Sequence, residues 1–199
     1  MFINKRIILA SASPRRNYLF QKIGFDFEIC PSLIQEVVDF QKTPLENAIS
    51  FSRLKAENIA QNFQDAFIVG ADTIVELDNC IIGKPQNKNE AYTILKRLSG
   101  YQHSVHTAFT IIDRPSNQLV SDVETTIVTF RELEDEEIKV YIDTQLPLDK
   151  AGAYGIQDKY GSLFVKKICG CFYNVVGFPL SKFYITLKKF QDNIKQGIL

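Results

Sequence analysis

Residues 9–16 of this chain read LASASPRR, a stretch that connects an apolar run to the start of a helical pattern. The apolar run, Ile7–Leu9, predicts the end of a buried strand. Ser13 is a favourable N-cap residue, and Pro14 suits the first helical position because the N–H that it lacks has no partner there. The stretch therefore predicts a strand, a turn of small residues and a helix N-terminus with free backbone N–H groups.

Two arginines, Arg15 and Arg16, fall in the first turn of this predicted helix, where the helix macrodipole favours negative charge. Two cations at this position are consistent with an anion held between them and the backbone N–H groups, and phosphate is the anion that we expect. The alternative is that both arginines are solvated on an ordinary helix.

The length and charge of the chain exclude several classes of function. With 199 residues it can bury a sizeable core as one large domain or two closely joined lobes, and without a clear linker we expect a single domain over residues 1–199. The 23 basic and 23 acidic residues balance, so no overall field points to nucleic acid or a membrane surface. Neither a secretory signal nor an apolar stretch of about 20 residues occurs, so we expect a cytoplasmic protein without a membrane span.

Cysteine and histidine residues do not form a recognisable metal pattern. The four cysteines are scattered and follow no zinc or redox spacing, so we expect free thiols rather than a zinc site. His103 and His106 lie three residues apart in a segment that alternates like a strand. This spacing places them on opposite faces and predicts that they do not share a metal ion.

Strand-like and helical patterns alternate along the chain, which predicts an α/β or α+β fold. The expected strands cover residues 25–30, 67–71, 73–77 and 80–82, a hairpin of 104–113 and 119–130, and an aromatic strand within 170–179. Four further helices are expected. The first begins at a capping box at Thr43 and runs to about Phe63, and the other three begin at Asn87, near Glu134 and near Pro179.

Polar residues interrupt these patterns at several points. Asp72 lies between two apolar runs, where aspartate is depleted, so it is either a turn residue or a carboxylate at a strand end near a ligand. Lys84 lies between a glycine and a proline after an apolar run, which is a weak signal alone. Lys55, beside the apolar stripe of a predicted helix, either snorkels or points at an anion. Glu36, in a polar segment, is uninformative by itself.

Residues 147–157 read PLDKAGAYGIQ, and their small residues suit a loop that closes against a ligand. Within this loop, Asp149, Lys150 and Gln157 supply an acceptor, a cation and an amide that can read the edge of a base.

These segments, in this order, resemble the Maf family of nucleoside triphosphate pyrophosphatases from Leu9 to about Pro179. The resemblance is carried by SASPRR at 11–16, Glu36, Lys55, GADT at 70–73, GKP at 83–85, DKAGAYGIQ at 149–157 and NVVG at 174–177. It implies the α/β fold shared with inosine triphosphate pyrophosphatases, a long mixed β-sheet with flanking helices and two lobes around a cleft. It also implies a cytoplasmic homodimer, dependent on Mg²⁺ or Mn²⁺, that cleaves a nucleoside triphosphate to the monophosphate and pyrophosphate.

The loop at 149–154 resembles that of the subgroup acting on dTTP and UTP, including some modified pyrimidine nucleotides. In this subgroup, the positions matching Arg15, Thr73 and Gln157 are linked to substrate choice, and Asp72 matches the proposed proton acceptor. Where the family often has an acidic pair, this chain has Gln35-Glu36 and so a single carboxylate. A 7-methyl-GTP-type pyrophosphatase and a nucleotide-binding regulator of septum formation are the alternatives.

The residue types fit hydrolysis of a triphosphate, in which cations must surround the phosphates and the attacking water must lose a proton. We expect Asp72, as proton acceptor, to act with Glu36 and Lys84 in catalysis. Glu36 and Asp72 are the expected metal ligands. The expected substrate-binding residues are Ser11, Ser13, Arg15, Arg16, Lys55, Thr73 and Gln157. The carboxylates argue against a module that only binds a nucleotide, and the balanced charge argues against a nucleic-acid partner.

Overall fold

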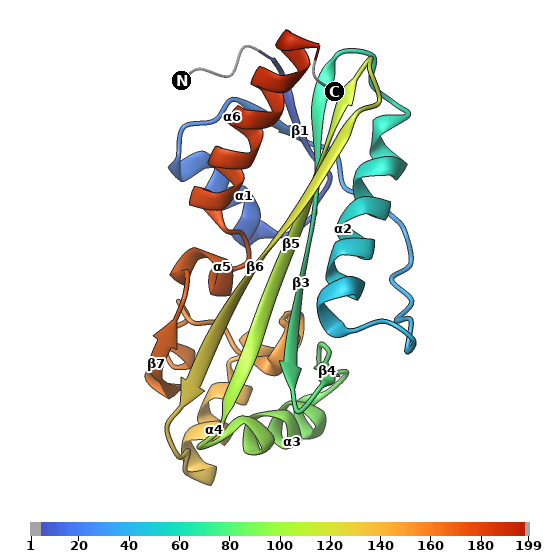
Figure 1. Cartoon of the computed structure of the whole chain (residues 1–199). Helices are drawn as coiled ribbons and strands as arrows, with labels where there is room; N and C mark the ends of the chain where they lie inside the picture. The colour runs from blue at the N-terminus through green and yellow to red at the C-terminus, as the bar shows by residue number, and fades with distance from the viewer. Residues whose placement is uncertain (1–4, 198–199) are drawn as a thin grey trace.

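Seven strands form one mixed β-sheet in the computed structural model, which describes residues 5–197 of the chain (Figure 1). In chain order the strands are β1 (Ile7–Leu9), β2 (Phe27–Ile29), β3 (Ala66–Leu77), β4 (Cys80–Ile82), β5 (Gln102–Arg114), β6 (Leu119–Phe130) and β7 (Val165–Cys169). Their order across the sheet is β2-β1-β3-β5-β6-β7, and β4 pairs with β3. β1 is parallel to both β2 and β3, and the other pairs are antiparallel.

Helices cover both faces of the sheet and one of its ends. They are α1 (Pro14–Lys22), α2 (Pro44–Ala60), α3 (Lys88–Leu98), α4 (Asp135–Asp143), α5 (Phe172–Val176) and α6 (Leu180–Gln196), with short 3₁₀ turns η1 (Leu146–Asp149), η2 (Ala151–Ala153) and η3 (Gly161–Phe164). α1 and α6 lie on one face and α2 on the other, whereas α3 and α4 lie at the far end of the long strands (Figure 1). Within residues 5–197, no helix combines the length and apolar character that crossing a membrane requires.

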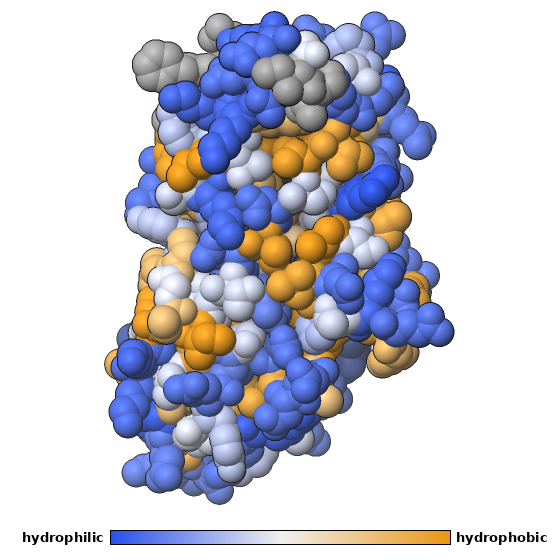
Figure 2. Space-filling model, in the orientation of Figure 1, coloured by the Kyte–Doolittle hydropathy of each residue, from blue (hydrophilic) through white to orange (hydrophobic). Residues whose placement is uncertain are grey.

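Strand β1 shows why the sheet is covered on both faces. Side chains alternate along a strand, so Ile7 and Leu9 pack in the cluster that contains Phe20 of α1, while Ile8 packs with Ile59 of α2. Both faces of a strand in this position are buried, which explains its continuous apolar sequence. Figure 2 shows that hydrophilic residues cover most of the face seen in Figure 1, with smaller hydrophobic areas between them.

These elements confirm the predicted α/β fold with a long mixed sheet and flanking helices. The predicted caps are also confirmed, because the side chains of Ser13, Thr43 and Asn87 each accept a hydrogen bond from a backbone N–H in the first turn of their helices. Helix α2 ends at Ala60, three residues before the expected position near Phe63. The predicted domain, residues 1–199, includes residues 1–4 and 198–199, which lie outside the described residues.

The prediction of separate strands on either side of Asp72 was wrong. Strand β3 is continuous, and its register with β5 runs without a break from Ala66 to Glu76, with Asp72 opposite Ala108. Asp72 is therefore neither a turn residue nor at a strand end. A buried carboxylate is tolerated in the middle of this strand because Lys55 of α2 supplies a positive charge at 2.6 Å.

The prediction of an aromatic strand within residues 170–179 was also wrong. The strand, β7, ends at Cys169, and the aromatic residues begin the short helix α5. Tertiary contacts override the strand propensity, since the buried Asn174 side chain donates hydrogen bonds to Val105 O of β5 and Thr126 Oγ1 of β6, both at 2.9 Å. These bonds fix α5 against the sheet.

A gap in the pairing of β3 leaves part of one strand edge open. β1 pairs with residues 67–69 of β3, and β4 pairs with residues 75–77. Because β5 occupies the other edge over this whole length, β1 and β4 must share one edge. Among the described residues no strand pairs with residues 70–74 on that edge, so this part of β3 is open between β1 and β4.

Gly70 allows α2 to lie directly against this open segment. A Cβ atom at Gly70 would lie 2.1 Å from Ser52 O and 2.6 Å from Ala56 N, both in the backbone of α2. We expect Gly70→Ala to lower the free energy of unfolding by about 1–3 kcal/mol, because α2 must move away from β3. Urea denaturation measures this loss. Gly83→Ala, where a Cβ meets nothing within 4 Å, is the control, and equal stability of both variants would contradict the argument.

Candidate active site

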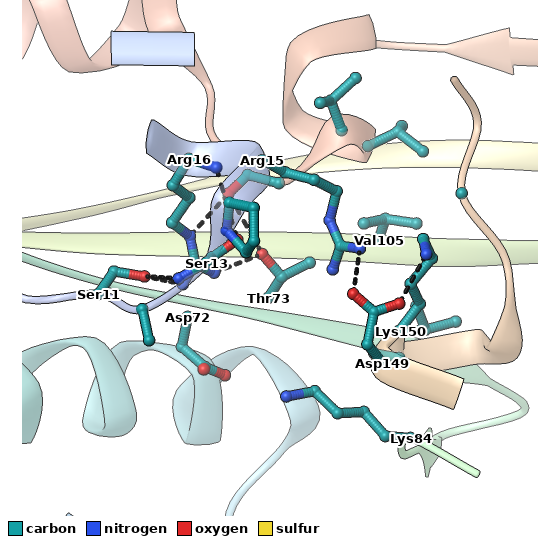
Figure 3. A pocket seen from close by; sticks show the side chains of 18 of the residues that line it. Ser11, Ser13, Arg15, Arg16, Asp72, Thr73, Lys84, Val105, Asp149 and Lys150 are labelled. Atoms are coloured by element: carbon teal, nitrogen blue, oxygen red, sulfur yellow. Dashed lines mark hydrogen bonds and ion pairs between the residues drawn. The ribbon is translucent and has the colours of Figure 1, made fainter. Parts of the chain in front are cut away.

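A cleft of about 340 Å³ opens at the unpaired edge of β3 (Figure 3). It lies between two groups of elements, the N-terminal turn with α1 and α2 on one side and the segments after β4 and α4 on the other. All of the predicted site residues line it: Ser11, Ser13, Arg15, Arg16, Glu36, Lys55, Asp72, Thr73, Lys84 and Gln157. The chain thus brings together side chains from segments that are far apart in sequence.

Arg16 connects three of these segments beneath the cleft. Its guanidinium group donates from Nε to Gly177 O at 3.0 Å, from Nη1 to Ser11 Oγ at 3.1 Å and from Nη2 to Thr73 Oγ1 at 2.9 Å. Thr73 Oγ1 in turn lies 3.0 Å from Thr107 Oγ1 of β5. Burial lowers the pKa of Arg16, yet an arginine keeps its charge in a protein. The result is a fixed positive charge whose position is set by the turn, β3 and the residue after α5.

Asp72 and Thr73 reach opposite faces of the sheet because consecutive strand residues alternate. Thr73 meets Arg16 on the α1 face, while Asp72 meets Lys55 on the α2 face. At an edge without a neighbouring strand, the two faces are accessible to one ligand. This geometry explains how neighbouring residues of β3 can contribute to one cleft.

Lys55 lies between two carboxylates. Its Nζ atom is 2.6 Å from Asp72 Oδ1 and 2.6 Å from Glu36 Oε1. Burial raises the pKa of Glu36, but the positive charge of Lys55, followed by that of Lys84, outweighs this effect and places the pKa below its ordinary value. Glu36 is therefore ionised at neutral pH. The ammonium group keeps the two negative groups close together.

Lys84 enters the cleft from the opposite wall. The carbonyl oxygen of the preceding Gly83 accepts a hydrogen bond from Gly152 N at 3.2 Å, which joins this turn to the 149–157 loop. Figure 3 shows the Lys84 side chain extended toward Asp72. Lys84 and Asp72 thus lie at the same end of the cleft.

The other end of the cleft contains Arg15 and the 149–157 loop. Arg15 Nη1 donates to Asp149 Oδ2 at 3.3 Å, and Lys150 Nζ donates to Asp149 Oδ1 at 2.6 Å. Figure 3 shows Arg15 and Asp149 facing each other, apart from Asp72. Gln157 is exposed in the lining of the same cleft.

Sequence reasoning missed two residues that support this loop, Tyr141 and Asp158. Tyr141 OH donates to Asp158 Oδ2 at 2.7 Å and accepts a hydrogen bond from Gly155 N at 3.1 Å, while Asp158 lies 3.4 Å from the Lys150 ammonium. Tyr141 has the pattern of a core residue of α4, and nothing in the sequence distinguishes Asp158 from an exposed aspartate. The sequence therefore contains no signal by which either residue could have been predicted.

Apolar side chains that include Val105, Tyr154 and Val175 also line the cleft, and we call them the apolar wall. Tyr154 is its largest member. Tyr154 OH lies 2.8 Å from His103 Nε2, and burial lowers the pKa of His103 to about 4, so this histidine is neutral at neutral pH. His106 has different partners, Glu76 and Thr125. Tyr154 is therefore held in the apolar wall by a buried, uncharged hydrogen bond.

Comparison with known proteins gives the family. A family model described as "Maf-like protein" matches residues 6–190. The chain belongs to the Maf family. This confirms the resemblance found in the sequence.

Several Maf relatives match over nearly their whole length. A protein of Carboxydothermus hydrogenoformans named "dTTP/UTP pyrophosphatase" is 48% identical over 92% of this chain and 98% of its own. A protein of the same name from Bacillus anthracis is 44% identical over 96% of this chain and 98% of its own. Among solved structures, a HAM1 protein from Coxiella burnetii has a TM-score of 0.43 at 16% identity, over 63% of this chain and 73% of that one.

Proposed function

We propose that this Maf-family chain is a nucleoside triphosphate pyrophosphatase that hydrolyses dTTP and UTP, including modified pyrimidine nucleotides, to the monophosphate and pyrophosphate. The main support is the convergence of Lys55, Lys84 and Arg16 with the carboxylates of Glu36 and Asp72 at one end of a cleft. A site of this kind binds a charged phosphate chain and also supplies a group that can accept a proton. The names of the relatives support the choice of nucleotide.

The cations stabilise the charge of the triphosphate as it reacts. Lys84 adds an ammonium group from the opposite wall, the ammonium group of Lys55 is held between Glu36 and Asp72, and Arg16 is fixed by its three hydrogen bonds. The backbone N–H groups at the start of α1 add further donors beside Ser11 and Ser13. Fixed donors stabilise developing negative charge without the reorganisation that water would need.

Asp72 accepts the proton of the attacking water. The water oxygen forms a bond to the α-phosphorus, the bond to the oxygen bridging the α- and β-phosphorus atoms breaks, and pyrophosphate leaves with that electron pair. Asp72 Oδ1 is occupied by Lys55, whereas Oδ2 makes no hydrogen bond to the residues that the structure describes. That oxygen is the one we assign to the proton.

Glu36 and Asp72 are the residues that would hold Mg²⁺ or Mn²⁺. Each has an oxygen atom 2.6 Å from the same Lys55 nitrogen, so the two carboxylates are neighbours in the cleft. No group of three or more possible ligands occurs within residues 5–197, which fits Mg²⁺, since this ion is usually held by one or two carboxylates and the phosphates of its substrate. When bound, the ion neutralises charge on the phosphates. A cytoplasmic homodimer remains our prediction for the assembly.

A panel of nucleoside triphosphates tests the assignment. The purified chain is incubated with UTP, dTTP, CTP, ATP and 7-methyl-GTP in Mg²⁺ or Mn²⁺, and pyrophosphate and monophosphate are measured separately. We expect equal amounts of the two products from UTP and dTTP. Release of single phosphate would refute the reaction, a preference for 7-methyl-GTP would refute the substrate, and binding without turnover would favour a regulator.

A further inference from the structure

The proposed reaction gives no role to one charged group in the cleft. Asp149 is negatively charged and so would repel the triphosphate, yet it faces the cleft from η1. It lies at the end where Arg15 enters, and Figure 3 shows it apart from Asp72. Among the described residues, its partners are the two cations Arg15 and Lys150. The Asp149 side chain is 62% exposed, so its oxygen atoms are accessible to a ligand group that donates a hydrogen bond.

Neighbouring residues hold Asp149 as a pure acceptor. Lys150 is buried, and its ammonium group donates hydrogen bonds to Leu146 O and Asp149 Oδ1 and lies 3.4 Å from Asp158 Oδ2. Burial raises the pKa of Asp149, but Lys150, followed by Arg15, outweighs this and lowers it below its ordinary value. Asp149 is therefore ionised at neutral pH, with oxygen atoms that only accept. Lys150 therefore positions this carboxylate.

Arg15 supplies the complementary donor beside Asp149. A guanidinium group has five N–H donors, and within residues 5–197 Arg15 uses one of them, for Asp149 at 3.3 Å. A ligand edge that presents an acceptor next to a donor can therefore bind both side chains at once. The apolar wall that includes Tyr154, Val105 and Val175 lines the same cleft and suits a flat ring.

Uracil and thymine carry such an edge. Their N3–H is a donor with a carbonyl oxygen on each side, and this part is identical in UTP and dTTP, which differ at C5 and at the 2′ position. Cytosine has the same ring size, but its N3 is an acceptor and would face the carboxylate without a hydrogen atom between them. Discrimination between UTP and CTP must therefore act at positions 3 and 4 of the ring.

We propose that Asp149 accepts the hydrogen bond from N3–H of uracil or thymine while Arg15 donates to a neighbouring carbonyl oxygen. Asp149 is then a specificity-determining residue that excludes cytosine by leaving two acceptors opposite each other. This inference rests on the proposed function and adds to it the group that recognises the base. Polar mismatch discriminates strongly because a site that hydrogen-bonds its substrate rejects an analogue that leaves its groups unpaired.

Substitution of Asp149→Asn tests the proposal, because an amide can accept from N3–H of uracil or donate to N3 of cytosine. The kcat/KM values for UTP and CTP are measured for both proteins. We expect the UTP-to-CTP ratio to fall by about tenfold or more, the size of a lost charge-assisted hydrogen bond. Asp143→Asn is the control, since it removes the same charge from an exposed residue of α4 outside the cleft, and its ratio should equal that of the unmodified protein.

A modified substrate gives a second test that requires no variant. The analogue 3-methyl-UTP replaces the N3 hydrogen with a methyl group, and we expect its kcat/KM to be at least about tenfold below that of UTP. The proposal is overturned if Asp149→Asn keeps the original UTP-to-CTP ratio, or if the unmodified protein hydrolyses 3-methyl-UTP as well as UTP. Absence of pyrophosphate from every nucleotide would instead refute the proposed function.

Discussion

Replacing Asp72 with Asn lowers kcat for UTP by about 10²- to 10⁴-fold, the usual effect of removing a general base. The substitution keeps the size of the side chain, and an amide can still accept a hydrogen bond from Lys55. It cannot take a proton from water. Pyrophosphate release at saturating UTP and Mg²⁺ measures the effect, and circular dichroism checks that the variant is folded.

A second variant controls for the general effect of removing a carboxylate near the end of β3. Asp78→Asn removes a carboxylate from the exposed turn that follows the same strand, outside the cleft lining. Asn suits this turn because Asp78 has φ of 52°, a conformation that asparagine adopts readily. We expect its kcat to match that of the unmodified chain. Retained turnover in Asp72→Asn would assign the proton to another group.

Much of this site was predictable because its local signals are strong. The Ser13 N-cap and the proline after it fix the start of α1, and alternating apolar residues fix most of the strands. The candidate residues came from their departure from these patterns, together with the resemblance to a family. That resemblance placed Lys55, Lys84 and Gln157 in one site although each alone was a weak signal. The cleft that contains all of them could be recognised only in the three-dimensional structure.

The errors have a common physical cause. The sequence predicts Asp72 in a turn or at a strand end because aspartate is rare in strands. Lys55, 17 residues earlier, instead compensates its charge in the middle of β3. Residues 170–179 were expected to be a strand, but Asn174 bonds to two other strands and holds a helix there. In both cases a contact distant in sequence outweighs the local propensity. The support of the 149–157 loop by Tyr141 and Asp158 depends on such contacts too.

Lys55→Met gives the other large effect that we expect. The variant keeps a long, flexible side chain but removes the charge between Glu36 and Asp72. By analogy with the loss of one preorganised donor to transition-state charge, kcat should fall by about 10²- to 10³-fold. Steady-state kinetics with UTP measures this loss. Arg53→Met is the control, because Arg53 is an exposed cation of the same helix that pairs with Glu57.

The pH profile of Lys55→Met distinguishes a role in charge from a role in packing. Lys55 has the largest effect among the positive charges that together hold the pKa of Glu36 below its ordinary value despite burial, so removing Lys55 raises this pKa. Glu36 then becomes protonated at a higher pH, and we expect the acid limb of kcat/KM to move upward. Lys55→Arg, which keeps the positive charge, should retain the original acid limb even where its kcat is reduced. The same acid limb in Lys55→Met and in the unmodified chain would contradict this prediction. The charge of Lys55 would then not control the pKa of Glu36, and the contacts of Lys55 would serve only to hold α2 against β3.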